Sequence, residues 1–420
     1  MEFKGIIREQ REELERIEKT ENIIKRERLD EGRSYLKYPN ILVITGARRS
    51  GKSIFSYLLE KDKKFAYVNF DDERLIGLRG EDLNKILESF YELYNNIDYI
   101  ILDEIQNIPN WELFVNRLRR TKKIIITGSN SNLLSGELAT HLTGRYLEIK
   151  LFPFSFIEFL RLKNFKILNE YTTEEKSKIL NYMREYLEYG GFPEAYKFGK
   201  AIVTKIYEDI LTKDIILRYK IKKIDELKKL AKYLISNSCG EISYLKLSKI
   251  LGIKHPSTIS NWVSYLEDSF LILKLEKFDF KLKQQFIAPK KIYCIDSGML
   301  DSIGFKFSEN KGKILENAVA IELQRKKEAV KELEVYYWKD YVQNEIDFVL
   351  KNKEKIEQLI QVSYINNKEE IKEREISSLI KGGKEFKCSN LIIITWNYES
   401  EEKFDGKKIK FIPLWKWLLV

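Results

Sequence analysis

Short apolar runs alternate with amphipathic stretches in the first third of the chain. The runs ILVIT (41–45), YIILD (99–103) and KIIIT (123–127) are almost uninterrupted, and each ends at a polar cluster. Runs of this kind are typical of strands that a parallel sheet buries on both faces, and the amphipathic stretches between them are typical of covering helices. The pattern therefore predicts an α/β domain over residues 36–152.

The first of these strands leads into Gly46-x-x-x-x-Gly51-Lys52-Ser53, and the amphipathic stretch IFSYLLE follows. This is a P-loop in its proper context, because glycines let backbone N–H groups and a helix N-terminus cradle phosphates. Lys52 is predicted to reach the β- and γ-phosphates, and Ser53 to ligate Mg²⁺. The predicted cofactors are ATP and Mg²⁺, and the predicted nucleotide-binding residues are Gly46, Ala47, Arg48, Arg49, Ser50, Gly51, Lys52 and Ser53.

The later strands of this domain end or begin at further candidates. Asp103 is predicted to hold the Mg²⁺ hydration shell, and Glu104 to orient and polarise the attacking water. Ser129, after the strand KIIITG, is predicted to sense the γ-phosphate or to aim the water. Arg145 directly precedes the strand YLEIK, where it is either a neutraliser of transition-state charge or a surface arginine.

The middle of the chain has a different pattern. Residues 153–222 are rich in helical patterns, and we interpret them as a helical lid. A helical segment at 225–236 precedes SYLKLSKILGI, the turn KHP, the helical STISNWVSYLEDSF and the apolar strand LILKLEKF. This order predicts a winged helix over residues 223–300.

The second helix of this predicted turn is the candidate nucleic-acid surface. Ser257 is expected to cap it, and Trp262 to face inward. The nucleic-acid candidates are Lys254, Thr258, Ser260 and Asn261, with Lys274, Lys277, Lys281 and Lys283 on the following wing. Winged helices also dock proteins, and this helix begins without Arg or Lys, so both uses stay open.

Residues 311–420 show the order helix, three strands, helix, strand, which is that of a PD-(D/E)XK nuclease core. Such a site needs convergent carboxylates and a lysine that activates water or stabilises charge. Glu316 and Asp347 supply two acids, whereas the third strand offers only Gln361 and Ser363. We interpret these four residues as the remnant of a nuclease site, in a weak or inactive domain used for binding.

A working nuclease remains the alternative, because Lys372 or Arg374 on the following helix is placed to take over the role of the missing lysine.

The sequence resembles the archaeal and bacterial P-loop ATPases of the AAA+/STAND group that carry a winged helix and a C-terminal nuclease-like domain. The matching segments are GARRSGKS, NFDDER, YIILDE, ITGSN, TGRY with LFPFSFIEFL, and YGGFPEAY, so the resemblance covers nearly all of the chain from about residue 36. It implies that Gly191-Phe192-Pro193 contacts the adenine. Residues 1–35, a charged segment with paired opposite charges, lie outside it and predict a solvated or docking helix.

Composition narrows the functional classes. The chain has 420 residues and a net charge of +10, and residues 221–290 alone hold 13 Lys or Arg against 7 Asp or Glu. Three scattered cysteines and two histidines exclude a disulfide framework and a thiolate zinc site, so any metal is expected on oxygen ligands. The amino terminus has no signal-peptide pattern and no run is long enough for a membrane span, so we expect a cytoplasmic protein.

Two functions follow. The first is an ATPase coupled to DNA through the winged helix and the degenerate nuclease-like domain; the second is an ATP-dependent signalling or assembly switch that docks a protein partner. If Arg145 acts across a subunit interface, the protein is a homo-oligomer, and the sequence leaves this open.

Overall fold

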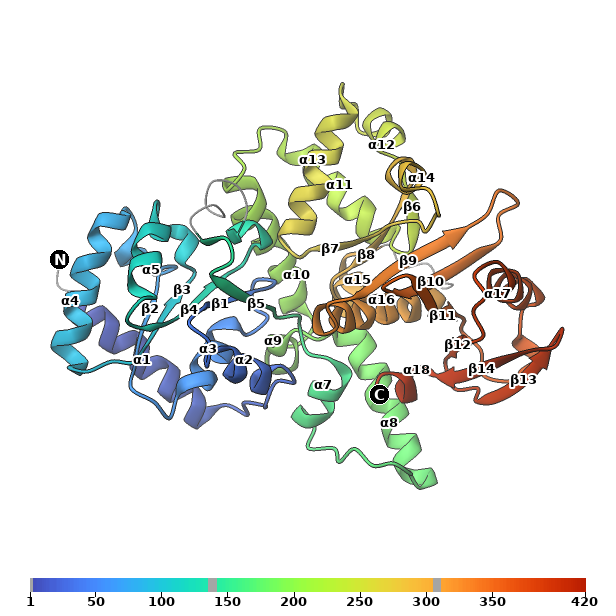
Figure 1. Cartoon of the computed structure of the whole chain (residues 1–420), viewed down its shortest axis with the longest axis horizontal. Helices are drawn as coiled ribbons and strands as arrows, with labels where there is room; N and C mark the ends of the chain where they lie inside the picture. The colour runs from blue at the N-terminus through green and yellow to red at the C-terminus, as the bar shows by residue number, and fades with distance from the viewer. Residues whose placement is uncertain (1–2, 135–141, 305–310) are drawn as a thin grey trace. The chain divides into compact units, whose positions relative to one another are not determined.

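The computed structural model describes residues 3–134, 142–304 and 311–420 (Figure 1). The chain forms two compact units. The first holds the residues up to Phe154 together with Arg161–Phe165 and Asp268–Phe270, and the second holds the rest.

The first unit is built on a sheet of five strands in the order β2-β3-β4-β1-β5, with every neighbouring pair parallel. The strands are β1 (Ile41–Thr45), β2 (Phe65–Asn69), β3 (Tyr99–Asp103), β4 (Lys123–Gly128) and β5 (Tyr146–Lys150). The central strand β1 is buried along its whole length, because neighbours and helices cover it on all sides. The predicted α/β domain with a parallel sheet is confirmed.

Helices cover both faces of this sheet, as Figure 1 shows. Val43 and Val68 pack on one face with α4 and α5, whereas Leu42 and Ile44 pack on the other with α2 and α3. Alternate residues of a strand point to opposite faces, so an apolar strand fills two cores at once. The helices are α1 (Phe3–Thr20), α2 (Leu29–Tyr35), α3 (Lys52–Glu60), α4 (Leu83–Tyr94) and α5 (Trp111–Leu118), with short 3₁₀ turns η1 (Glu73–Leu75), η2 (Gly80–Asp82), η3 (Ile105–Asn107) and η4 (Ser131–Leu134).

Helix α1 docks onto this sheet. Phe3, Ile6 and Ile7 are buried in the core that α4 and α5 share, and Leu14 is buried in the core on the other face. Gln10 is also buried, and its amide Nε2 donates to the carbonyl of Asn69 at 3.1 Å. The N-terminal charged segment is therefore a docked part of the first unit, as one of the two expectations had it, and not a solvated helix.

The second unit contains two sheets. The smaller is antiparallel in the order β6-β8-β7, with β6 (Gly240–Ile242), β7 (Ile272–Leu275) and β8 (Lys290–Cys294). The larger has the order β13-β14-β12-β11-β10-β9, with β9 (Leu333–Lys339), β10 (Glu345–Asn352), β11 (Lys355–Val362), β12 (Leu391–Thr395), β13 (Ser400–Phe404) and β14 (Lys407–Pro413).

The second unit also contains helices. The first helix after β5 is α7 (Phe156–Leu162). It is followed by α8 (Thr173–Tyr189), α9 (Pro193–Phe198), α10 (Ala201–Asp209), the π-helix η5 (Ile210–Leu217), α11 (Ile224–Ser236), α12 (Tyr244–Ile250) and α13 (Pro256–Asp268). The remainder are α14 (Leu282–Ile287), α15 (Ser297–Ile303), α16 (Lys311–Ala329), the 3₁₀ turn η6 (Lys368–Glu370), α17 (Glu373–Glu385) and α18 (Leu414–Trp417).

The expected order of helices and strands is present after residue 223, with two kinds of difference. Helix α13 begins at Pro256, so Ser257 lies inside its first turn instead of capping it. Strands β6 and β8, helices α14 and α15, and the closing elements β13, β14 and α18 were not predicted. Helix α14 is only six residues long, and its large apolar residues Leu282, Phe286 and Ile287 are exposed, so it has no buried apolar face that periodicity could reveal.

The segment after β7 joins the two sheets of the second unit. Phe278 donates its backbone N–H to the carbonyl of Tyr337 at 2.7 Å, and Tyr337 donates to the carbonyl of Glu276 at 3.0 Å. The Phe278 ring packs against Trp338 and Phe386 in the core of the larger sheet. The base of the predicted wing is thus anchored to β9.

In the described ranges, no helix combines the length and apolar character needed to cross a membrane.

Replacing a buried residue of α1 tests whether this helix is integral. Ile7 is 1% exposed, so Ile7→Ala leaves a cavity and should lower the free energy of unfolding by about 2–4 kcal/mol. Glu13→Ala, at an exposed position of the same helix, is the matched control and should change it by less than about 0.5 kcal/mol. Denaturant melts that give equal stability for both variants would show that α1 is dispensable to the unit.

The last residue of α3 makes stability depend on pH. Glu60 is buried, its Oε2 has no hydrogen-bond partner among the described atoms, and burial raises its pKa to about 7 from the usual 4.5. Because the folded-state pKa is the higher one, this carboxyl costs no stability below about pH 4.5 and lowers stability as pH rises through about 7. Glu60→Gln should therefore gain about 1–3 kcal/mol over the wild type between pH 5 and pH 8.5 in denaturant melts. Glu88→Gln, at an exposed position of α4, should show no such gain.

Candidate functional site

The P-loop leaves β1 at the carboxyl edge of the sheet and turns sharply into α3. Gly46 has φ +150°, and a Cβ there would lie 2.1 Å from the carbonyl oxygen of Leu151. Gly51 precedes α3 with φ +93°. Both positions therefore need glycine, and the free N–H groups of the first helical turn stand next to the loop.

Lys52 is buried inside the loop that it follows. Its Nζ donates to the carbonyls of Gly46 and Ala47, both at 3.2 Å, and lies 3.4 Å from Oε1 of Glu104. The ammonium is therefore held by its own loop and by the acid that follows β3.

Asp103, the last residue of β3, is fully buried in a ring of hydroxyl groups. The Tyr67 hydroxyl donates to its Oδ2 at 2.6 Å, the Thr127 hydroxyl donates to Oδ1, and the Ser53 hydroxyl is a third partner. Burial raises the pKa of the Asp103 carboxyl, and the charge of Glu104 adds to the shift while the hydrogen bonds oppose it. The predicted pair Ser53 and Asp103 is thus brought together.

Glu104 follows with φ +52°, a left-handed conformation rare for a side chain of this size. Its backbone N–H donates to the Thr127 hydroxyl at 3.0 Å, which fixes the turn. Burial disfavours the charged form, but Lys52 and Arg48 lower the pKa of Glu104, so it is held as a carboxylate beside the P-loop. A carboxylate in this place is suited to accept a proton or orient a water.

The loop and its surroundings fit a magnesium–nucleotide group. The Ser50 hydroxyl and Gln106 Oε1 are buried without a hydrogen-bond partner among the described atoms, which is unusual for polar groups unless a further molecule completes them. Ser53 and Asp103 supply the oxygen ligands that Mg²⁺ prefers. Arg48 and Arg49 complete the loop, with Arg48 Nη1 at 3.2 Å from Oδ2 of Asp71.

Ser129 lies at the carboxyl ends of the parallel strands, and Arg145 lies at their amino ends. Gly128 pairs with Thr45, so the buried Ser129 follows β4 beside the start of the P-loop, where it was expected. Arg145 instead precedes β5, and its carbonyl accepts from the N–H of Ile41, the first residue of β1. A five-residue strand is about 16 Å long, so Arg145 lies away from the P-loop of its own chain. Its role at the nucleotide, within one subunit or across an interface, stays a prediction.

Four residues near the site were missed from the sequence. Tyr67 and Thr127 hold Asp103, and Gln106 donates from Nε2 to Oε2 of Glu104 at 2.5 Å. Arg26 is buried and donates to the carbonyl of Ser50 at 2.9 Å. Only Thr127 carried a signal, as the polar end of an apolar strand.

The second unit brings the predicted nuclease remnant together around a residue that was not predicted. Glu316 on α16 and Asp347 on β10 both face Lys291 of β8, with Nζ at 3.0 Å from Oε1 of Glu316 and 3.4 Å from Oδ1 of Asp347. Burial and the charge of Glu316 hold the pKa of Asp347 well above its usual value. The convergence of the two acids is therefore as expected.

Gln361 and Ser363 do not join them as free ligands. Gln361 Oε1 accepts from the backbone N–H of Asp347 at 3.3 Å, and the Ser363 hydroxyl donates to Glu375 at 3.1 Å. Lys372 is exposed and lies 3.5 Å from the same Glu375. Arg374 donates to the carbonyl of Gln343 at 3.0 Å, so neither cation of α17 contacts Asp347.

No group of three or more His, Cys, Asp or Glu side chains in residues 3–134, 142–304 and 311–420 is arranged to hold a metal ion.

The nucleic-acid candidates on and before α13 differ in exposure. Lys254 and Asn261 are exposed, and Thr258 and Ser260 are half-buried. Trp262 on the same helix is buried, as expected.

The Gly191-Phe192-Pro193 segment has a structural role in the second unit. Gly191 donates its N–H to Oδ2 of the buried Asp296 at 2.6 Å, and Pro193 begins α9. Burial raises the pKa of Asp296 to about 6. The contact of Pro193 with adenine stays a prediction.

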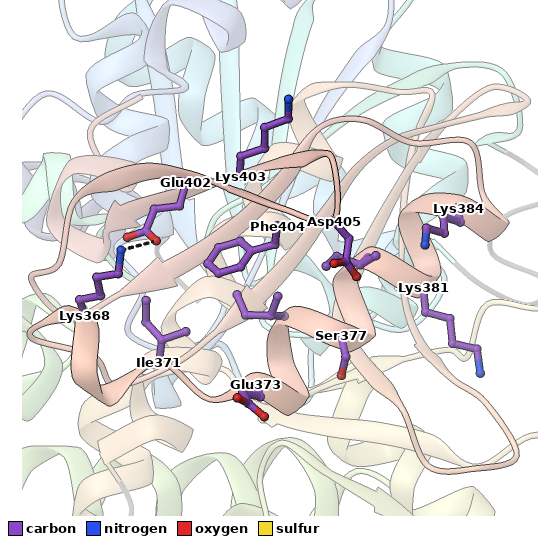
Figure 2. Close-up of a pocket in the computed structure, with 12 residues that line it drawn as sticks. Lys368, Ile371, Glu373, Ser377, Lys381, Lys384, Glu402, Lys403, Phe404 and Asp405 are labelled. Carbon is purple, nitrogen blue, oxygen red and sulfur yellow. Dashed lines mark ion pairs between the residues drawn. The ribbon is translucent and has the colours of Figure 1, made fainter.

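A groove of about 780 Å³ lies between α17 and the β13–β14 hairpin. Figure 2 shows Ile371 and Phe404 within it, and Lys368 paired with Glu402 on one side. Lys381 and Lys384 extend from the helix at the other side. None of the residues predicted for chemistry lines this groove.

Three family models match consecutive parts of the chain. An AAA domain matches residues 38–160, and two domains of unknown function, DUF8612 and DUF4143, match residues 180–309 and 311–417. The AAA match coincides with the P-loop, the parallel sheet and the acids at its edge. The first unit is therefore a P-loop domain of the AAA class.

Two relatives cover nearly the whole chain. It is 40% identical over 403 residues to the uncharacterized protein MJ1544 of Methanocaldococcus jannaschii, covering 91% of this chain and 89% of the relative. It is 31% identical over 397 residues to an uncharacterized protein of Haemophilus influenzae, covering 89% of this chain and 94% of that one. The chain belongs to the family that these proteins form.

Among solved structures, the Walker-type ATPase paby2304 of Pyrococcus abyssi matches 67% of this chain and 96% of its own, with 15% identity and a TM-score of 0.45. A likeness this distant carries no argument about function.

Proposed function

We propose that the chain is a Mg²⁺-dependent ATPase whose nucleotide state controls how the second unit binds DNA. One observation carries the first half of this proposal. Lys52, Ser53, Asp103 and Glu104 converge at one edge of the parallel sheet, linked by contacts of the Lys52 and Asp103 side chains.

Each of these residues has a task in hydrolysis. The backbone of residues 46–51 and the Lys52 ammonium bind the phosphates, while Ser53 and Asp103 hold Mg²⁺. Glu104 orients the attacking water and takes up its proton. Ser129, beside the loop, contacts the γ-phosphate.

The Lys52–Glu104 ion pair makes hydrolysis depend on binding. At 3.4 Å the Lys52 ammonium and the Glu104 carboxylate form an ion pair, which makes Glu104 a weaker base. Phosphates are stronger partners for the ammonium, because they carry more charge than a single carboxylate. When Lys52 moves to them, Glu104 loses its partner and becomes the stronger base.

The arrangement of the second unit supports the DNA half of the proposal. Along the chain, helix α11 is followed by strand β6, then by helices α12 and α13, and then by strands β7 and β8. The three strands form an antiparallel sheet in the order β6-β8-β7, as in a winged helix. Lys254 and Asn261 stand exposed at the start of the second helix of the turn. The excess of 13 basic over 7 acidic residues in 221–290 favours contacts with phosphates.

A protein partner is the second candidate, and one surface favours it. Phe280, Leu282, Phe286 and Ile287 are each 65–72% exposed within eight residues of the wing. Lys274 is paired with Glu267 at 2.6 Å, so this lysine is less available to DNA. Clustered exposed apolar side chains are typical of a protein-docking surface.

ATP turnover with Mg²⁺ tests the proposal directly. We expect Lys52→Ala to abolish turnover and Glu104→Gln to lower it about 10²–10⁴-fold while the nucleotide still binds, because only the proton acceptor is lost. Turnover should rise when single-stranded, duplex or branched DNA is added, and the rise should be smaller in Lys254→Ala. Lys384→Ala, in the groove of the larger sheet, is the matched control.

The outcomes separate the candidates. Turnover that survives in Lys52→Ala would come from a contaminant and leave the first half without support. Turnover that no DNA form changes, together with no DNA binding at low salt, would replace the DNA-coupled function with docking of a protein partner.

Arg145 tests for an oligomer. Since it lies far from its own P-loop, it reaches a nucleotide only across an interface between copies, and turnover per subunit should then rise with protein concentration and fall in Arg145→Ala. Unchanged turnover in Arg145→Ala at every concentration would make it a surface arginine. Its Nη1 donates to Asn116 at 3.1 Å, so Asn116→Ala is the control for a purely local effect.

A further inference from the structure

Lys291 is one of the most deeply buried charged side chains of the second unit, at 2% exposed. Its ammonium lies 2.6 Å from Oε1 of Glu345, 3.0 Å from Glu316 and 3.4 Å from Asp347. Glu316 comes from α16 and the other two acids come from β10. One cation is thus surrounded by three carboxylates from two elements, which is where a metal-dependent nuclease of this element order would need its ion.

The oxygens that a metal would need are already engaged. Asp347 Oδ1 faces Lys291, and Oδ2 accepts from the backbone N–H of Val362 at 2.9 Å. Glu316 Oε1 accepts from the Tyr293 hydroxyl at 2.9 Å as well as from Lys291. Gln361 is turned to the backbone of Asp347. The residues present therefore do not fit a divalent ion beside Lys291.

A second lysine completes the balance of charge. Lys339 on β9 lies 3.5 Å from Oε2 of Glu345 and 3.2 Å from Glu241 of β6. Both cations and most of their partners are held by strands of the two sheets, so the arrangement is rigid. Three enclosed carboxylates without these lysines would repel one another and be costly to bury.

We propose that the Lys291 ammonium is the resident cation of this carboxylate site and takes the position of the divalent metal. The three acids, which stand in the nuclease-like order of elements, then bind Lys291 of β8 and so connect the three-stranded sheet to the six-stranded one. The domain binds without cutting. This inference rests on the second unit alone and stands or falls separately from ATP hydrolysis.

The test uses the full-length, nucleotide-free protein and Mn²⁺ as the probe. Lys291→Met removes the charge at similar length and should lower the melting temperature by roughly 5–10 °C, because three acids lose the cation that they share. Millimolar Mn²⁺ should recover at least half of that loss, and the recovery should vanish in Lys291→Met/Asp347→Asn. Lys291→Arg, which keeps the charge, should lose much less, and Lys283→Met, at an exposed lysine, should melt like the wild type with or without Mn²⁺.

A Mn²⁺ titration of the wild type against Asp347→Asn provides a second readout, which does not depend on Lys291→Met. In a Mn²⁺ titration followed by electron paramagnetic resonance, the wild type and Asp347→Asn should bind the ion equally. Wild-type binding that Asp347→Asn abolishes would overturn the proposal, since the carboxylates would then hold a metal despite Lys291. A Lys291→Met variant that melts like the wild type, or that Mn²⁺ fails to stabilise, would overturn it as well.

Discussion

A charge can be buried only if an opposite charge or a full set of hydrogen bonds lies beside it, and two buried lysines show how this constraint organises the chain. Lys52 has one carboxylate partner, Glu104, and two carbonyls of its own loop. Lys291 has three carboxylate partners. A cation with one acid partner can move to a phosphate, because only one carboxylate then needs another partner. A cation that balances three acids cannot leave without destabilising the fold.

The two units therefore differ in what their charges are able to do. In the first unit, some polar groups around the P-loop lack hydrogen-bond partners. The Ser50 hydroxyl and Gln106 Oε1 are buried and have no partner among the described atoms. In the second unit the carboxylate cluster is saturated by Lys291, Tyr293 and a backbone N–H. Incomplete polar groups favour an exchangeable ligand, whereas saturated ones favour permanent structure. The unpartnered groups beside the P-loop therefore favour a bound ligand in the first unit.

The residues that could be predicted are those whose position follows from one strand. Asp103, Glu104 and Ser129 follow buried strands, and the carboxyl ends of parallel strands meet at one edge, so periodicity alone placed them with the P-loop. Arg145 stands at the start of a strand, and the pairing of Tyr146 with Ile41 places it at the end of the sheet away from the P-loop, so its role at a nucleotide stays a prediction. Lys291 was missed because it follows Lys290 in the same strand, and no local signal tells which of two neighbouring lysines faces the acids. Arg26 was missed because it lies in a loop that is distant from the P-loop in sequence and meets it only in the fold.

The anchoring of the segment after β7 limits how the two sheets of the second unit can move relative to each other. The segment after β7 pairs with β9 through Phe278 and Tyr337, and β8 is tied to β10 through Lys291. Backbone and charge thus connect the small sheet to the large one at two separate places. A wing held in this way cannot swing independently, since any swing would break a buried ion pair and unpair backbone groups. Within the second unit, the two sheets are therefore joined as one body.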